Sequence, residues 1–263
     1  MDYNNFFDSH PVFTLEELRL VNQNQRPASV YNNLKYYMKK GRVRIIKPGL
    51  YYVLPAGSNA EKYHPDSIHL ASRLRKDSVL AFHTALDIMG YGHSLFHIFY
   101  YYSKMRMRKF FFKEDEFICI KVPESLKKKK MEMFGVEEIV YKNLPVQCTN
   151  RERTFIDCLN RPEYCGGIEE LYRCIEKYPY VSFDEIIKYL DRLEKKVLYA
   201  KVGFFLQQHR DQFYVDDNIL NDLKKHITSS IVYFDHNRRS GKLIKEWNLV
   251  VPDIIIDRGW EEF

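Results

Sequence analysis

Apolar residues near the N-terminus recur with helical spacing and predict a short, capped helix. In the run from Thr14 to Glu17, the Thr14 hydroxyl can accept a hydrogen bond from the Glu17 amide while the Glu17 carboxylate reaches back, which is a capping box. Leu15 and Leu18 give this helix an apolar side. The polar segment 22–25 follows and predicts a turn.

A second, amphipathic helix is predicted directly after this turn. Pro27 suits its first position, because proline has no amide hydrogen that would need a partner there. Its apolar stripe, at positions i, i+4, i+7 and i+8, consists of Val30, Leu34, Tyr37 and Met38. The opposite face carries small, amide, aromatic and cationic residues, namely Ala28, Ser29, Asn32, Lys35, Tyr36 and Lys39, with Asn33 on the flank. Gly41 is placed to end the helix in the left-handed conformation.

Two short strands around a turn are predicted next. In segment 42–45 outward cations alternate with inward apolar residues. Segment 47–50 fits a type II turn, with Pro48 at i+1 and Gly49 at i+2, and segment 50–54 forms the return strand. A helix, a turn, a second helix and a β-hairpin in this order predict a winged helix-turn-helix over residues 1–60.

This segment contains no acidic residue from Leu18 to Ala60, which favours a polyanionic partner. On the exposed helical face the amides come early and the lysines late, so we expect base contacts first and phosphate contacts later in a DNA major groove. Asn32 and Asn33 are candidates for adenine. The predicted DNA-binding residues are Ser29, Asn32, Asn33, Lys35, Tyr36, Lys39, Lys40, Arg42, Arg44 and Lys47. The alternative is a winged helix for protein contacts, whose lysines only solvate a surface.

Residues 61–263 predict a mixed α/β domain with a small antiparallel sheet and a helical C-terminal half, followed by a tail from about 207. The predicted helices are 66–74, 82–89, 149–159 with Thr149 as the N-cap, 168–177, 182–190, 195–206 and 219–226. The predicted strands are 96–102, 109–112, 117–122 and 231–234. The tail also contains a segment anchored by Trp247. Together with the N-terminal module, the fold class is α+β.

Two further basic groups lie in this second domain. The first, Lys104, Arg106, Arg108 and Lys109, is a candidate second polyanion surface, because alternation in an extended segment places Arg106 and Arg108 on one face. The second is the run 127–130, for which an exposed loop is the favoured interpretation.

Composition excludes some classes of protein but does not indicate a function. The 263 residues are 45% hydrophobic and 15% aromatic, as in a globular protein, and the net charge of +6 is mild for this length. Five cysteines without CxxC spacing predict buried, reduced thiols. The N-terminus lacks the features of a signal peptide, and no apolar run is long enough for a membrane span. A cytoplasmic protein without a membrane partner is expected.

Ordered sequence blocks resemble those of AbiEi-type antitoxins of type IV toxin–antitoxin systems. The blocks are VFTLEELR (12–19), SVYNNLKYYMKKGRVRIIKPGLYYV (29–53), HPDSIHLASRLRKDSVLAFHTALDIMGY (64–91), PVQCTNRERTFIDCLNRPEYCGGIEELYRCI (145–175) and GKLIKEWNLVVP (241–252). The resemblance implies a repressor of its own operon, bound to double-stranded operator DNA with inverted repeats. It also implies an antitoxin that counters a neighbouring nucleotidyltransferase-like toxin. The turn before the second helix is richer in Asn and Gln than the family pattern.

The sequence offers no persuasive active site, so a non-enzyme without cofactor or metal is expected. His93 and His97 have the spacing of zinc ligands on a helix, but Gly90 and Gly92 argue against a helix there. Phosphate-binding and nucleophile-elbow motifs are missing from the sequence. Two alternative functions remain open: a stand-alone winged-helix regulator without a toxin, and a DNA-targeting nuclease with a winged-helix specificity module.

Overall fold

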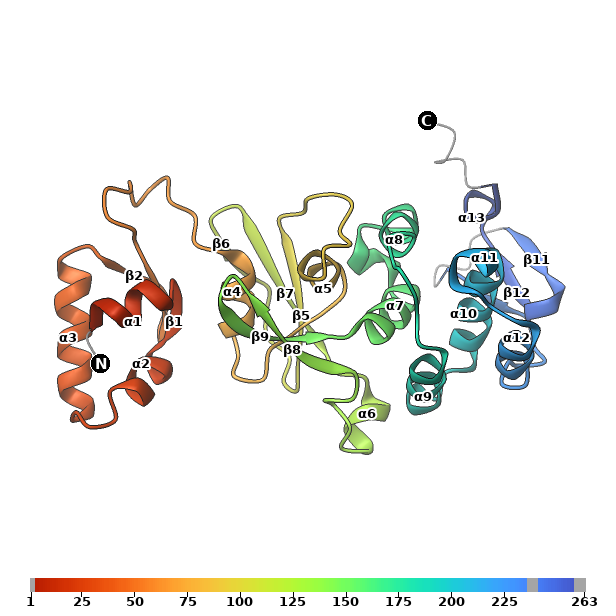
Figure 1. Ribbon diagram of the computed structural model, residues 1–263, viewed down its shortest axis with the longest axis horizontal. Coiled ribbons are helices and arrows are strands. Elements are labelled where there is room, and N and C mark those ends of the chain that lie inside the picture. Colours follow the sequence, from red (N-terminus) through yellow and green to blue (C-terminus); the bar gives the residue numbers. More distant parts are fainter. Residues whose placement is uncertain (1–2, 236–240, 258–263) are drawn as a thin grey trace. The chain divides into compact units, whose positions relative to one another are not determined.

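The computed structural model describes residues 3–235 and 241–257, which form a mixed α+β fold (Figure 1). Contacts divide the chain into two compact units. The first unit contains residues 1–80, 96–121 and 138–148, and the second contains residues 81–95, 122–137 and 149–263. Segment 1–60 therefore belongs to the first unit, which also contains later parts of the chain.

The N-terminal segment of the first unit combines helices with a small antiparallel sheet. Its helices are α1 (Tyr3–Ser9), α2 (Leu15–Val21) and α3 (Pro27–Lys39). Its strands are β1 (Val12–Thr14), β2 (Val43–Lys47) and β3 (Leu50–Val53), in the order β1-β3-β2. The helix, turn, helix and hairpin were predicted, whereas α1 and β1 were not.

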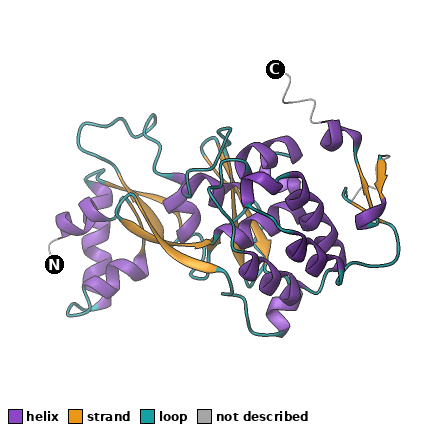
Figure 2. Ribbon diagram, turned by 45° about the vertical axis from the view of Figure 1, so that its right-hand side comes forward, coloured by secondary structure: helices purple, strands orange, loops and turns teal. Residues whose placement is uncertain are grey.

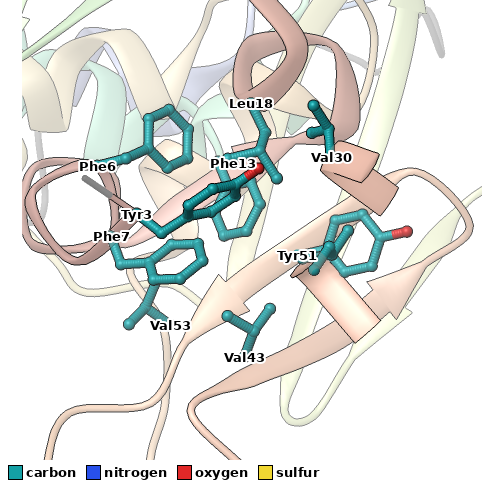
Figure 3. Packing of buried hydrophobic residues seen from close by; sticks show 10 residues of the cluster. Tyr3, Phe6, Phe7, Phe13, Leu18, Val30, Val43, Tyr51 and Val53 are labelled. Carbon is teal, nitrogen blue, oxygen red and sulfur yellow. The ribbon is translucent and has the colours of Figure 1, made fainter. Parts of the chain in front are cut away.

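The unpredicted α1 supplies much of the local core (Figure 3). Phe6 and Phe7 are fully buried and pack on Phe13 of β1, with ring centroids 5.3 and 5.6 Å apart. The predicted stripe of α3 completes this core: Val30 and Leu34 are fully buried, and the other two members are partly buried. Burial of these residues sets the rotation of α3 about its own axis.

The rest of the first unit is built on a mixed sheet in the order β6-β7-β5-β4-β9-β8. Its elements are α4 (Ser67–Arg73), β4 (Val79–Leu80), β5 (Ile98–Ser103), β6 (Phe110–Phe112), β7 (Asp115–Lys121), β8 (Val136–Tyr141) and β9 (Leu144–Thr149). The prediction of a purely antiparallel sheet is wrong, because β5 pairs with β7 and β4 with β9 in parallel. Alternation of apolar residues locates a strand but does not give the direction of its neighbour.

Helices dominate the second unit, which confirms the predicted helical C-terminal half (Figure 2). They are α5 (His83–Ile88), α6 (Glu124–Lys128), α7 (Arg151–Asn160), α8 (Ile168–Ile175), α9 (Phe183–Leu193), α10 (Lys196–Gln208), α11 (Arg210–Phe213), α12 (Asp217–Lys224) and α13 (Asp253–Asp257). Short 3₁₀ turns (Pro162–Cys165 and Lys245–Trp247) and a small sheet complete it: β10 (Val232–Tyr233), β11 (Lys242–Ile244) and β12 (Leu249–Val251). None of the described helices combines the length and apolarity needed to cross a membrane.

The predicted N-cap of α7 is displaced by one residue. Asn150, not Thr149, caps the helix, and its side chain accepts a hydrogen bond of 3.0 Å from the Arg153 amide. The hydroxyl of Thr149 instead lies 2.7 Å from that of Thr154, and both are buried. Both residue types can cap a helix, so sequence alone does not separate two such neighbours.

Helix α10 contacts the predicted Trp247 anchor. A Cβ atom added to Gly203 would lie 2.2 Å from the Trp247 ring, so glycine provides the space that the indole fills. The indole is fully buried, and its N–H donates to the side-chain oxygen of Gln207. The tail is therefore packed onto α10 through a matched glycine and tryptophan.

The same helix carries a buried lysine. Lys201 is 1% exposed, and its Nζ atom donates to the Leu159 carbonyl at 3.1 Å and lies 5.1 Å from the centre of the Phe234 ring. Burial lowers the pKa of Lys201 from its ordinary value of 10.5 to about 8. The folded state therefore releases this proton at lower pH than the unfolded chain does.

This difference predicts a stability that rises with pH. Between pH 8 and 10.5 the unfolded chain holds a proton on Lys201 that the folded protein has lost, so alkaline pH favours folding there. Relative to Lys201→Met, the unfolding free energy of the natural protein should rise by about 1.4 kcal/mol per pH unit. Urea unfolding across this range measures the difference. The exposed Lys196→Met variant of the same helix is the control, and parallel curves for all three proteins would contradict the prediction.

Candidate nucleic-acid interface

The start of α2 is fixed by the predicted capping box. The Glu17 amide donates to the Thr14 hydroxyl at 3.1 Å, and the Thr14 amide donates to the Glu17 carboxylate at 2.6 Å. The other oxygen of Glu17 accepts from Arg73 at 3.1 Å. The carboxylate of Glu17 thus has a partly buried partner in Arg73, whereas Glu16 forms an exposed ion pair of 2.5 Å with Lys76.

The polar turn before α3 is stabilised by hydrogen bonds of its own side-chain amides. Asn22 is buried and donates to the Leu18 carbonyl at 3.0 Å, while Gln25 donates to Asn22 at 3.4 Å. Asn33 donates to the Tyr3 hydroxyl of α1 at 3.1 Å, and that hydroxyl donates to Gln25 at 3.0 Å. Asn33, predicted as an adenine contact, is thus half-buried and occupied by a local network.

The outward side of α3, here called the α3 face, brings together most of the predicted helical contacts. The exposed members are Ser29, Asn32, Lys35, Tyr36, Lys39 and Lys40. The Nζ atom of Lys35 lies 4.6 Å from the centre of the Tyr31 ring, and that of Lys40 lies 5.8 Å from the Tyr36 ring. No residue of α3 is acidic. Amide and hydroxyl groups therefore occupy the first half of this face, and cations the second.

The predicted hairpin cations differ in what they contact. Arg44 is exposed, whereas Arg42 forms an ion pair of 2.7 Å with Asp8 of α1. Lys47 is half-buried and donates to the Leu74 carbonyl at 2.9 Å. Burial, and then the nearby charge of Arg75, lowers the pKa of Lys47. Lys47 is therefore directed into the first unit rather than outward as predicted.

The predicted alternation in β2 breaks down at Ile45. This side chain is 49% exposed, although its neighbour Val43 is fully buried. Ile45 pairs with Tyr51 in the same register as Val43 with Val53, so the two side chains lie on the same side of β2 and Ile45 is simply less covered. The register shifts only afterwards, between Ile45 and Lys47.

The second basic group lies in the connection between β5 and β6. Arg106 and Arg108 are exposed on either side of the half-buried Met107, as the predicted alternation requires. The Tyr101 hydroxyl lies 3.8 Å from the Met107 sulfur, and Lys109 pairs with Glu116 at 2.5 Å. Lys104 is exposed, and its backbone amide donates to the Asp77 carboxylate.

The lysine run 127–130 is only partly the predicted loop. Lys127 and Lys128 belong to α6, and Lys129 pairs with Glu194 at 2.6 Å. The helical half was missed because four successive lysines carry no apolar spacing that would mark a helix.

The histidine pair considered from the sequence does not lie on a helix, because residues 90–97 form the connection between α5 and β5. The Nδ1 atom of His97 lies 2.8 Å from the Asp115 carboxylate. Across residues 3–235 and 241–257, a group of three metal-ligating side chains occurs at His83, Glu170 and Cys174. Sequence spacing carries no signal for this group, because His83 is separated by 87 positions from Glu170.

Comparisons with known proteins support the fold of this chain but give no information on its function. No protein-family model matches the chain, and no curated relative does. Among solved structures, the crystal structure of the RV2827C protein from Mycobacterium tuberculosis is similar, with a TM-score of 0.55 at 15% sequence identity. The match covers 93% of this chain and 87% of that one. At this identity the likeness supports the mixed α+β fold alone.

Proposed function

We propose that the N-terminal segment is a winged helix-turn-helix and that the protein is a sequence-specific repressor of its own operon. The observation that carries the proposal is the α3 face, which is exposed, free of acids and ordered from amides to cations. A helix of this kind fits the major groove of double-stranded DNA. The hairpin β2–β3 takes the place of the wing.

We propose different roles for the residues of this interface. Ser29 and Asn32 lie in the first half of α3 and are proposed to contact bases, while the lysines of the second half and Arg44 contact phosphates. Asn33, Arg42 and Lys47 have intramolecular partners, so they support the interface rather than contact DNA directly. Lys104, Arg106 and Arg108 are proposed as a second polyanion surface.

Salt dependence tests the phosphate contacts. With six to ten phosphates neutralised, operator affinity should fall by about 10³ to 10⁵ between 50 and 200 mM salt. Lys35→Ala should lower the slope of log K against log salt by about 0.9 for each phosphate that the variant no longer neutralises. Lys47→Met serves as the matched control and should leave the slope unchanged, since its ammonium is bound to the Leu74 carbonyl. A flat salt response of the natural protein would refute DNA binding.

Base reading is tested by comparing operator with random DNA. Asn32→Ala should lower the discrimination between the two by about 1–3 kcal/mol, because it removes an amide proposed to pair with a base edge. Arg44→Ala should weaken binding to both DNAs alike, because a phosphate contact carries no sequence information. Fluorescence anisotropy titrations of the natural protein and both variants on the two DNAs measure the six affinities. Equal losses on both DNAs for Asn32→Ala would exclude it from base reading.

We further propose that the protein acts as the antitoxin of an adjacent nucleotidyltransferase-like toxin, on the strength of the ordered sequence blocks that resemble AbiEi-type antitoxins. Induction of the neighbouring reading frame alone should arrest growth, and co-expression of this chain should restore it. Asn32→Ala is the informative control, because weaker operator recognition should leave the rescue intact when both genes are expressed from separate plasmid promoters. Growth arrest that persists with the natural chain would contradict the antitoxin role.

A further inference from the structure

The second unit contains a buried cluster of histidine, carboxylate and thiol side chains. His83 is the first residue of α5, and Glu170 and Cys174 lie one turn apart on α8. The Nε2 atom of His83 is 3.1 Å from Oε1 of Glu170, and the Cys174 sulfur is 3.3 Å from the same oxygen. All three residues are buried, and their ligand atoms lie within 4.8 Å of one another.

Neighbouring groups fix the orientation of the cluster. Asp87, one turn after His83, lies 3.1 Å from Nδ1 of the imidazole, so Nε2 is aimed at Glu170. The carboxylate of Asp87 fits there because position 92 is glycine: an added Cβ would lie 2.0 Å from its Oδ1 atom. A histidine ligand that gives its other ring N–H to a carboxylate is the usual outer-shell arrangement at zinc sites.

Nearby donors fix the position of the Glu170 carboxylate. The amide and the hydroxyl of Ser94 donate to its two oxygens at 2.8 and 2.6 Å, and the His93 amide donates to it at 3.1 Å. These bonds hold the carboxylate where its Oε1 atom faces both His83 and Cys174.

A zinc ion can take the place of the hydrogen bonds within the cluster. The Nε2 atom of His83 and the sulfur of Cys174 both face one oxygen of Glu170. Zinc binding requires the Cys174 thiol to release its proton to solvent, because thiolate is the form that binds the metal. Tetrahedral Zn–N, Zn–O and Zn–S bonds place neighbouring ligand atoms about 3.3–3.7 Å apart. The separations of 3.1 and 3.3 Å therefore need to open by only a few tenths of an ångström.

We propose that His83, Glu170 and Cys174 bind a zinc ion that joins α5 to α8, with Asp87 as the outer-shell partner of His83. The donor set of imidazole nitrogen, carboxylate oxygen and thiolate sulfur is one that Zn²⁺ takes in proteins. Three protein ligands leave the fourth tetrahedral position to water or another group. The zinc site includes none of the proposed DNA contacts.

The test uses the full chain, purified without a histidine tag from zinc-supplemented cells. The protein should contain one zinc per chain by elemental analysis, and replacement with Co²⁺ should give a thiolate-to-cobalt absorption band. Cys174→Ser and His83→Gln should lose the zinc and the band, while each keeps a donor toward Glu170. Cys148→Ser, which alters a fully buried thiol outside the cluster, should keep both. Asp87→Asn should weaken zinc binding about 10- to 100-fold.

Separate outcomes support or overturn the proposal. Zinc that disappears only in the two ligand variants, with their far-ultraviolet circular dichroism unchanged, supports it. A natural protein that takes up neither Zn²⁺ nor Co²⁺ overturns it and leaves a proton-bridged ion cluster. Zinc retained in Cys174→Ser also overturns it, because the metal is then held elsewhere. Neither result depends on whether the protein binds operator DNA.

Discussion

The burial of Val30 and Leu34 is the constraint on which the N-terminal surface depends. Both side chains are fully buried in the core that α1 and β1 complete. Burial of one such side chain is worth about 1.5–3 kcal/mol, whereas an exposed ion pair contributes about 0–1 kcal/mol. Rotation of α3 would exchange these residues for lysines in the core. The apolar stripe, rather than any surface charge, therefore decides which residues form the α3 face.

Features that depend on neighbours in the sequence were predictable. The capping box at Thr14 and Glu17, the start of α3 at Pro27 and its buried stripe follow from hydrogen bonds and packing within one or two turns. The exposed positions of Asn32 and Lys35 follow in the same way, because an α-helix fixes the angle between successive residues.

Features that depend on distant partners were not predictable. Asp8 lies outside the segment 18–60, which contains no acidic residue, but pairs with Arg42 inside it. Leu74 supplies the carbonyl that binds Lys47. Sequence patterns do not predict these contacts, because they join residues far apart in the sequence and form only when the chain folds. The same reason hides the His83 cluster, whose members come from helices far apart in the chain. Charge counted along a sequence window thus overstates the charge offered to a partner.

Helix α1 has a consequence for how DNA preference can change in evolution. Tyr3 forms hydrogen bonds with Asn33 and Gln25, and Asp8 forms an ion pair with Arg42. Helix α1 therefore supports both α3 and the hairpin without belonging to the exposed α3 face. A substitution at Tyr3 removes one of the two partners of the Asn33 amide, and one at Asp8 removes the carboxylate that pairs with the Arg42 guanidinium. With α3 as the proposed reading helix, operator preference can therefore drift through α1 while every residue of the α3 face stays the same.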